Sequence, residues 1–189
     1  MTGNRPLTRT GLYDPIHEHD SCGVGFVADI KGRKSRGIIV DALEILRNLE
    51  HRGACGCDAL TGDGAGILIQ IPQDFMSRVA DECRIALPPA GEYGTGIVFF
   101  PTEAADRDLC LKTFERIIRE EGQTLLGWRE TPTNSGCIGH VARRVEPLMR
   151  QVFIGRGDCP KTDDWAFERK LYVIRKRVEN EIRGSNIRQ

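Results

Sequence analysis

The chain has 189 residues, of which 40% are hydrophobic and 29% are charged, with 27 basic and 27 acidic side chains. This balance gives no general electrostatic attraction to nucleic acid or to a membrane surface, and no apolar run approaches the roughly 20 residues that cross a bilayer. The first 21 residues are polar and lack the apolar stretch of a secretory signal. The sequence therefore predicts a cytoplasmic protein that binds neither nucleic acid nor membrane.

Hydrophobic periodicity predicts five strands that interleave with four helices. Their irregular spacing favours an α+β fold over regular βαβ winding. We expect Thr102 as the N-cap of the third helix and Gly122 as its terminator. The predicted strands lie near residues 22–30, 66–71, 95–100, 124–131 and 151–155, and the predicted helices span residues 38–53, 73–83, 102–122 and 164–184.

The last predicted helix repeats apolar residues at helical spacing, and its opposite face is basic, as is usual for a solvated surface. The chain stops just after this helix, so no later element is available to cover its apolar stripe. The sequence therefore predicts the appearance of a truncated domain. The stripe consists of Phe167, Leu171, Ile174, Val178 and Ile182.

Seven cysteines are spread almost evenly along the chain, which is typical of neither a disulfide scaffold nor a zinc module. Cys55 and Cys57 lie two residues apart in "ACGC", but no second pair stands at ligand spacing. We therefore expect no bound metal. A small redox or metal protein that uses these cysteines is kept as an alternative.

Cys22 differs from the other cysteines in its surroundings, because it follows the small Ser21 and precedes two glycines, Gly23 and Gly25. Glycines there would let a substrate approach closely. Cleavage between Ser21 and Cys22 would put a thiol nucleophile and a free α-amine on one residue. Since an α-amine has a pKa of about 7.7–8.0, it can act as the base for its own side chain.

A second group of candidate residues lies in "LEHRGACGCDALTGDGAGI". Arg52 occupies a turn bounded by Gly53, where its guanidinium can bind a carboxylate with two hydrogen bonds. The glycines of "GDGAG" predict positive φ angles or tight backbone packing. A phosphate-binding loop is disfavoured because this segment precedes a strand, whereas such loops follow a strand and open a helix. His51 is expected as a surface or capping residue.

Three segments, "GLYDPIHEHDSCGVGFVADI", "LEHRGACGCDALTGDGAGILIQIP" and "LYVIRKRVE", together resemble the class II, N-terminal-cysteine glutamine amidotransferase domain of the glutamate synthase large-subunit family. The similarity runs in order from about Gly11 to Arg183, and "TGDGAGI" is particular to the glutamate synthase type. The resemblance implies part of a four-layer αββα N-terminal-nucleophile hydrolase. It also implies a removable leader over residues 1–21 and the N-terminal part of the domain over residues 22–189.

The resemblance implies that Cys22 attacks the side-chain amide of glutamine, releases ammonia and leaves a thioester, which water then hydrolyses. Arg52 and Gly53 would bind substrate or order the site, with Gly62, Asp63 and Gly64 in a loop nearby. No cofactor is expected in this chain. In the whole enzyme, ammonia would aminate 2-oxoglutarate with FMN and a 3Fe-4S cluster, and the partners would be the rest of the chain and a small subunit or ferredoxin.

Two segments of the family pattern are missing from these 189 residues: the arginine segment that grips the substrate carboxylate, and the His-Asn-Gly segment that forms the oxyanion hole. "PTNSG", residues 132–136, contains Asn134 but not the motif. Losing one oxyanion donor commonly costs about 10²–10³ in rate. The chain alone is therefore expected to be inactive. A non-catalytic interaction module that keeps the scaffold is the alternative.

Overall fold

The computed structural model describes residues 23–49 and 64–185, and it divides into two compact units, residues 1–68 and 69–189. In the first unit, helix α1 (Arg36–Asn48) follows an extended segment, residues 23–29, and a short turn. The expected end of this helix at Gly53 lies outside the described residues. Instead, Leu49 caps the helix directly after Asn48.

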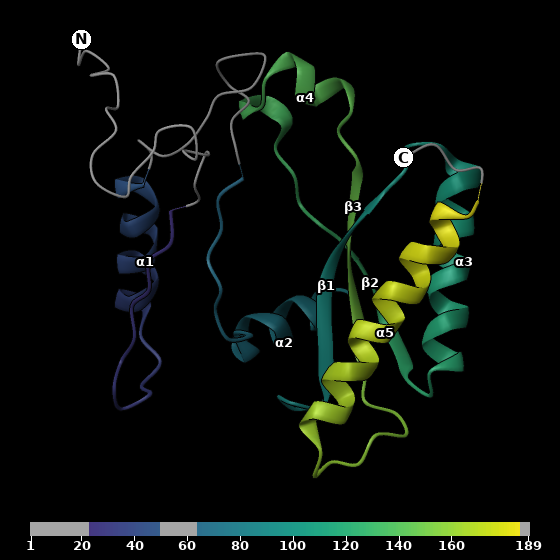
Figure 1. The fold of residues 1–189 in the computed structure, drawn as a ribbon, viewed down its shortest axis with the longest axis horizontal. Coiled ribbons are helices and arrows are strands. Elements are labelled where there is room, and N and C mark those ends of the chain that lie inside the picture. The colour runs from purple at the N-terminus through teal and green to yellow at the C-terminus, as the bar shows by residue number, and fades with distance from the viewer. Residues whose placement is uncertain (1–22, 50–63, 186–189) are drawn as a thin grey trace, which may run out of the picture. The chain divides into compact units, whose positions relative to one another are not determined.

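The second unit is built on a three-stranded antiparallel sheet with the strand order β1-β3-β2 (Figure 1). This arrangement confirms the α+β class and the existence of the last three predicted strands. The sequence missed two short elements, η3 and α4. The elements are α2 (Gln73–Glu82), β1 (Tyr93–Phe100), α3 (Ala104–Glu120), β2 (Thr124–Glu130), η3 (Ser135–Cys137), α4 (His140–Arg144), β3 (Leu148–Gly155) and α5 (Asp164–Arg183).

The central strand β3 supplies the core on both faces of the sheet, because successive side chains of a strand point to opposite faces. Val152 and Ile154 pack with residues of α3 and α5, whereas Phe153 packs with Tyr93 and with residues of α2. Burying each such side chain stabilises the fold by about 1.5–3 kcal/mol. The sheet is therefore covered by α3 and α5 on one face and by α2 on the other.

The apolar stripe of α5 is covered by elements that precede it in the chain. Phe167, Ile174 and Val178 are buried, and Leu171 and Ile182 pack against the same cluster. The expectation of an uncovered stripe is therefore wrong. The physical reason is that α5 folds back over the sheet and beside α3, a neighbourhood that periodicity along one helix does not reveal.

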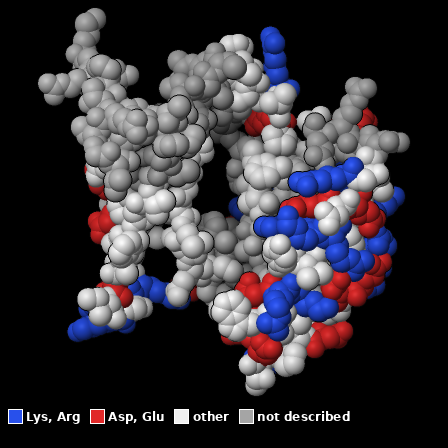
Figure 2. Space-filling model, in the orientation of Figure 1, with Lys and Arg blue, Asp and Glu red and all other residues white. Residues whose placement is uncertain are grey.

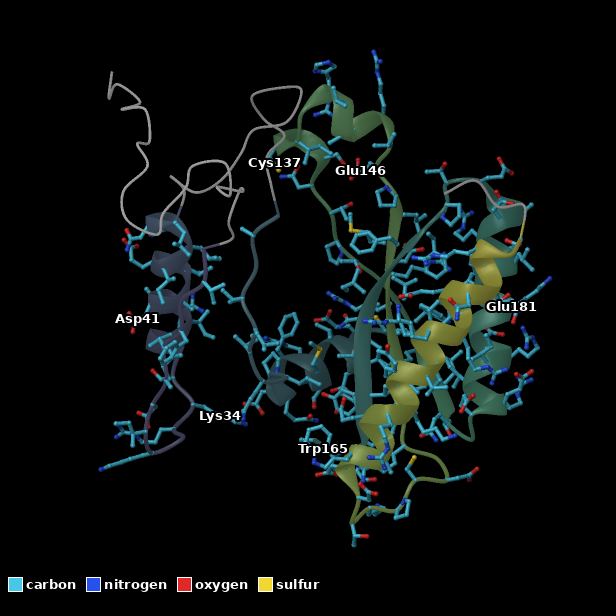
Figure 3. All side chains as sticks on the ribbon, viewed as in Figure 1. Lys34, Asp41, Cys137, Glu146, Trp165 and Glu181 are labelled. Atoms are coloured by element: carbon cyan, nitrogen blue, oxygen red, sulfur yellow. The ribbon has the colours of Figure 1, made fainter. Side chains whose placement is uncertain are left out.

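The basic face of α5 is also more than a solvated surface. Arg177 and Lys170 donate hydrogen bonds to Glu121 at the end of α3, and Arg177 pairs with Glu120 as well. Arg116 of α3 pairs in turn with Glu181, which Figure 3 shows on the flank of α5 toward α3. Figure 2 shows basic and acidic side chains interleaved over these two helices. Opposite charges therefore connect α3 to α5 along their exposed side.

Two predicted strands, 22–30 and 66–71, are corrected by the structure. Residues 23–29 and 64–71 run without regular secondary structure, and the described residues contain no strand that pairs with either segment. Val24 and Phe26 are 89% and 92% exposed, and Leu68 is fully exposed. The alternating pattern is present, but a strand also requires a neighbour that satisfies its backbone groups.

The ends of α3 give one correction and one confirmation. Its N-cap is Glu103, with no side-chain capping hydrogen bond, so the predicted Thr102 cap is wrong. Gly122 ends the helix as predicted, with φ at 71°. The N–H of Gln123 then donates to the carbonyl of Ile118 at 3.0 Å, which is the bond expected after a left-handed residue. No helix in the described ranges is long and apolar enough to span a membrane.

Candidate functional site

Most residues of the predicted site lie outside the described parts of the chain. Cys22, Arg52, Gly53, Gly62 and Asp63 belong to this group. The structure does describe the residues that directly follow Cys22 and those that lead toward Arg52. Both stretches belong to the first unit, so the framework around the candidate site can be built from them.

The two glycines after Cys22 lie against helix α1. A Cβ atom at Gly23 would stand 2.7 Å from Cδ2 of Leu49, and one at Gly25 would stand 2.5 Å from Cγ2 of Ile45. Real Cβ atoms almost never come this close to other carbon atoms. The absence of side chains at these positions therefore allows the extended segment to contact the helix. This finding replaces the sequence-based interpretation, in which the glycines leave room for a substrate.

A compact turn joins this segment to α1. The carboxylate of Asp29 accepts hydrogen bonds from the backbone N–H of Lys31 at 2.8 Å and from the Arg33 side chain at 2.8 and 3.1 Å. The hydrogen bonds from Arg33 lower the pKa of Asp29 most. Gly32 supplies the left-handed residue of the turn, with φ at 66°. The chain therefore reverses direction within a few residues.

Helix α1 begins with a side-chain cap. Ser35 adopts an extended conformation, and its hydroxyl oxygen accepts a hydrogen bond from the N–H of Gly37 at 3.0 Å. A serine in this position typically contributes about 1 kcal/mol to helix stability. Sequence reasoning missed Asp29 and Ser35 as supports of the site, although Asp and Ser before a helix are ordinary turn and capping signals.

Gly64 is the one predicted site residue that the structure describes. It is exposed, it does not have a positive φ angle, and no described heavy atom lies within 4 Å of its would-be Cβ position. The same holds for Gly66. The expected positive φ or tight packing is therefore wrong for these two glycines, because the chain runs extended and exposed from residue 64 to residue 71.

The second unit contains a cavity of about 1020 Å³ at the C-terminal end of β1, lined also by α3, α5 and the segment before β3. Phe100, Phe114 and Ile182 give it apolar walls. Cys110 lines it too, but burial, followed by the charge of Asp106, raises the pKa of this thiol. Because a protonated thiol is a poor nucleophile, Cys110 has no catalytic role in the arrangement seen here.

The cysteines form no metal centre in the described part of the chain. Cys83, Cys110, Cys137 and Cys159 are free thiols, and no group of three or more His, Cys, Asp or Glu side chains there is placed to hold a metal ion. Cys55 and Cys57, on which the redox or metal alternative depends, lie outside the described residues.

Comparison with known proteins gives a consistent match over this framework. The class-II glutamine amidotransferase family profile matches residues 22–189. The NADPH glutamate synthase large chain of Bacillus subtilis is 47% identical over 181 residues, covering 95% of this chain and 12% of that protein. The NADH glutamate synthase of Schizosaccharomyces pombe is 39% identical, covering 90% and 8%. Ferredoxin-dependent glutamate synthase 1 of Arabidopsis thaliana is 38% identical, covering 90% and 10%.

Proposed function

The chain belongs to the class-II glutamine amidotransferases, and from this premise we propose that it supplies the glutaminase portion of a glutamate synthase large chain. The observation that carries the proposal is the extent of the family match, which begins at Cys22 and continues to Gln189. Cys22 is also the residue that the sequence singles out as a nucleophile. The matched relatives are glutamate synthases with three different electron donors in their names.

In the proposed reaction, removal of residues 1–21 exposes the α-amine of Cys22. This amine takes the thiol proton, and the thiolate attacks the side-chain carbonyl carbon of glutamine. Collapse of the tetrahedral adduct breaks the C–N bond and leaves a thioester, while the proton passes to the departing ammonia. Water, deprotonated by the same amine, hydrolyses the thioester to glutamate. Arg52 and Gly53 order this end of the site, with the loop of Gly62, Asp63 and Gly64 beside it.

The proposed fold of the complete domain is the four-layer αββα arrangement. The sheet face that carries α2 supports this proposal, because α2 covers only part of it. Ile97 and Phe99 of β1 are 44% and 65% exposed, and both alternate with residues that point toward α3 and α5. A second sheet packed on this face would bury both side chains and place two sheets between helical layers.

In the whole enzyme, we propose that the ammonia aminates 2-oxoglutarate at a second site in an oxidoreductase reaction of glutamate biosynthesis. FMN and a 3Fe-4S cluster would supply electron transfer there, with a small subunit or ferredoxin as electron-donating partner, in the cytoplasm. The described residues offer no cluster of metal ligands. We therefore assign no residue of residues 23–49 or 64–185 to either cofactor.

The test uses the full-length polypeptide that carries this segment. Cys22→Ser should reduce glutamine-dependent glutamate formation to background and leave ammonia-dependent formation intact, because only the glutaminase step requires the thiolate. The intact mass of the active enzyme should place its N-terminus at Cys22. Equal loss of both activities would contradict the two-site reaction. A wild-type chain that binds glutamine without releasing ammonia would instead support a non-catalytic module.

A further inference from the structure

We propose that Ile45 and Leu49 of α1 are positioning residues for the glutaminase reaction, because they set the register of the segment that begins with the nucleophile. The inference rests on the proposed function. It starts from two contacts in the first unit, between Gly23 and Leu49 and between Gly25 and Ile45. Neither α1 residue belongs to the motifs that carry the chemistry.

The spacing of the two contacts matches the geometry of both elements. Gly23 and Gly25 are two residues apart in an extended chain, a distance of about 6.6 Å along the segment. Ile45 and Leu49 are four residues apart on one face of a helix, a rise of about 6 Å. Since the sequence number increases along the segment as it decreases along the helix, the two elements run antiparallel. Both glycines therefore contact α1 in a single register.

This register brings the start of the segment to the C-terminal end of α1. The Cα atom of Cys22 lies one peptide, about 3.8 Å, from that of Gly23. Arg52 follows Leu49 by three residues, so its Cα atom lies within about 11 Å of that of Leu49. The Gly23–Leu49 contact therefore joins the two chain positions from which Cys22 and Arg52 extend. A shift in register would move the nucleophile relative to the arginine.

Ile45 is the less adaptable of the two contacts. Its Cγ2 is attached directly to Cβ, and a β-branched side chain in a helix has one strongly preferred χ1 rotamer. Leu49 meets Gly23 with its terminal methyl groups, which can move with less disturbance of the backbone. A methyl group at position 25 should therefore displace the segment more than a methyl group at position 23.

The experiment uses Gly25→Ala in the full-length polypeptide, alone and combined with Ile45→Leu, which removes the Cγ2 branch but keeps the side-chain volume. A misplacement of about 1 Å can cost roughly 100-fold in rate. We expect Gly25→Ala to lower the kcat for glutamine at least about tenfold and to leave ammonia-dependent activity unchanged. The double variant should recover most of this loss, and Gly23→Ala should lose less than Gly25→Ala.

Gly96→Ala is the matched control, because no described atom lies within 4 Å of the added methyl group and its φ angle is ordinary. Two results would overturn the inference: unchanged glutamine kcat in Gly25→Ala, or no recovery with Ile45→Leu although ammonia-dependent activity is intact. The pH profile of Cys22 alkylation separates positioning from stability, since Gly25→Ala should alter it and Gly96→Ala should not. Absence of ammonia release by the wild type would overturn the proposed function. The melting temperatures of the single and double variants would still test the register.

Discussion

Arg177 donates a hydrogen bond from Nη1 to Oε1 of Glu121 at 2.6 Å, so the middle of α5 is tied to the residue that ends α3. Lys170 donates to the other carboxylate oxygen at 2.8 Å. The bonds from Lys170 and then Arg177 lower the pKa of Glu121. A carboxylate whose folded pKa is lowered contributes stability above its unfolded pKa, and this contribution is lost as pH falls through the folded value.

Glu121→Gln should therefore lower the free energy of unfolding of the 189-residue chain at pH 7. The difference from wild type should shrink as the pH falls below about 4.3, the ordinary value for a glutamate, because the wild-type carboxylate then becomes neutral as well. Urea titrations between pH 7 and pH 2.5 measure this. Glu181→Gln, in a more exposed pair, should have a smaller effect. A difference that is independent of pH would contradict the assignment to charge.

Gly157→Ala should destabilise the second unit strongly. A methyl group at position 157 would overlap the backbone carbonyl oxygen of Gly122, which also accepts a hydrogen bond from the N–H of Asp158 at 2.9 Å. Because a backbone atom cannot turn aside as a side chain can, we expect a cost of about 2–3 kcal/mol. Gly96→Ala, with open space around it, should be neutral or slightly stabilising. Similar melting temperatures for the two variants would contradict this interpretation.

Arg84→Gly should stabilise the chain. Arg84 follows α2 and has a φ of 58°, in the left-handed region that disfavours side chains. The chain passes through it so that the N–H of Ile85 can donate to the carbonyl of Ala80 at 2.8 Å. Glycine relieves the steric cost, so we expect a gain of about 1 kcal/mol in the free energy of unfolding. In contrast, Glu82→Gly inside the helix should cost about 0.5 kcal/mol. A loss of stability in Arg84→Gly would show that the arginine side chain has a compensating role.

Two substitutions on α5 test whether its apolar stripe is covered within this chain. Ile174 is 1% exposed and packs in the core cluster, so Ile174→Ala should cost about 2–5 kcal/mol. Tyr172 is 57% exposed and contacts Arg175 through its ring, so Tyr172→Ala should cost less than about 1 kcal/mol. Chemical denaturation of the 189-residue chain gives both values. Equal, small effects would indicate that α5 does not pack as described.

The sequence by itself predicted the elements whose pattern is complete within one segment. The apolar spacing of α5, the buried run of β1 and the left-handed Gly122 after α3 each depend on neighbouring residues along the chain, and the structure confirms all three. The candidate nucleophile, Cys22, and its partner Arg52 come from the same kind of local pattern. Their chemistry is a property of residue type and order, which a sequence contains in full.

The tertiary structure alone decided which surfaces meet. Periodicity showed that α5 has an apolar stripe but not that the sheet and α3 cover it. Alternation at residues 23–29 predicted a strand, but hydrogen bonds need a neighbouring strand, and this segment contacts a helix instead. The role of Gly25 likewise depends on Ile45, twenty positions further along the chain. Packing is a relation between distant residues, so it follows from the folded chain and not from any one segment.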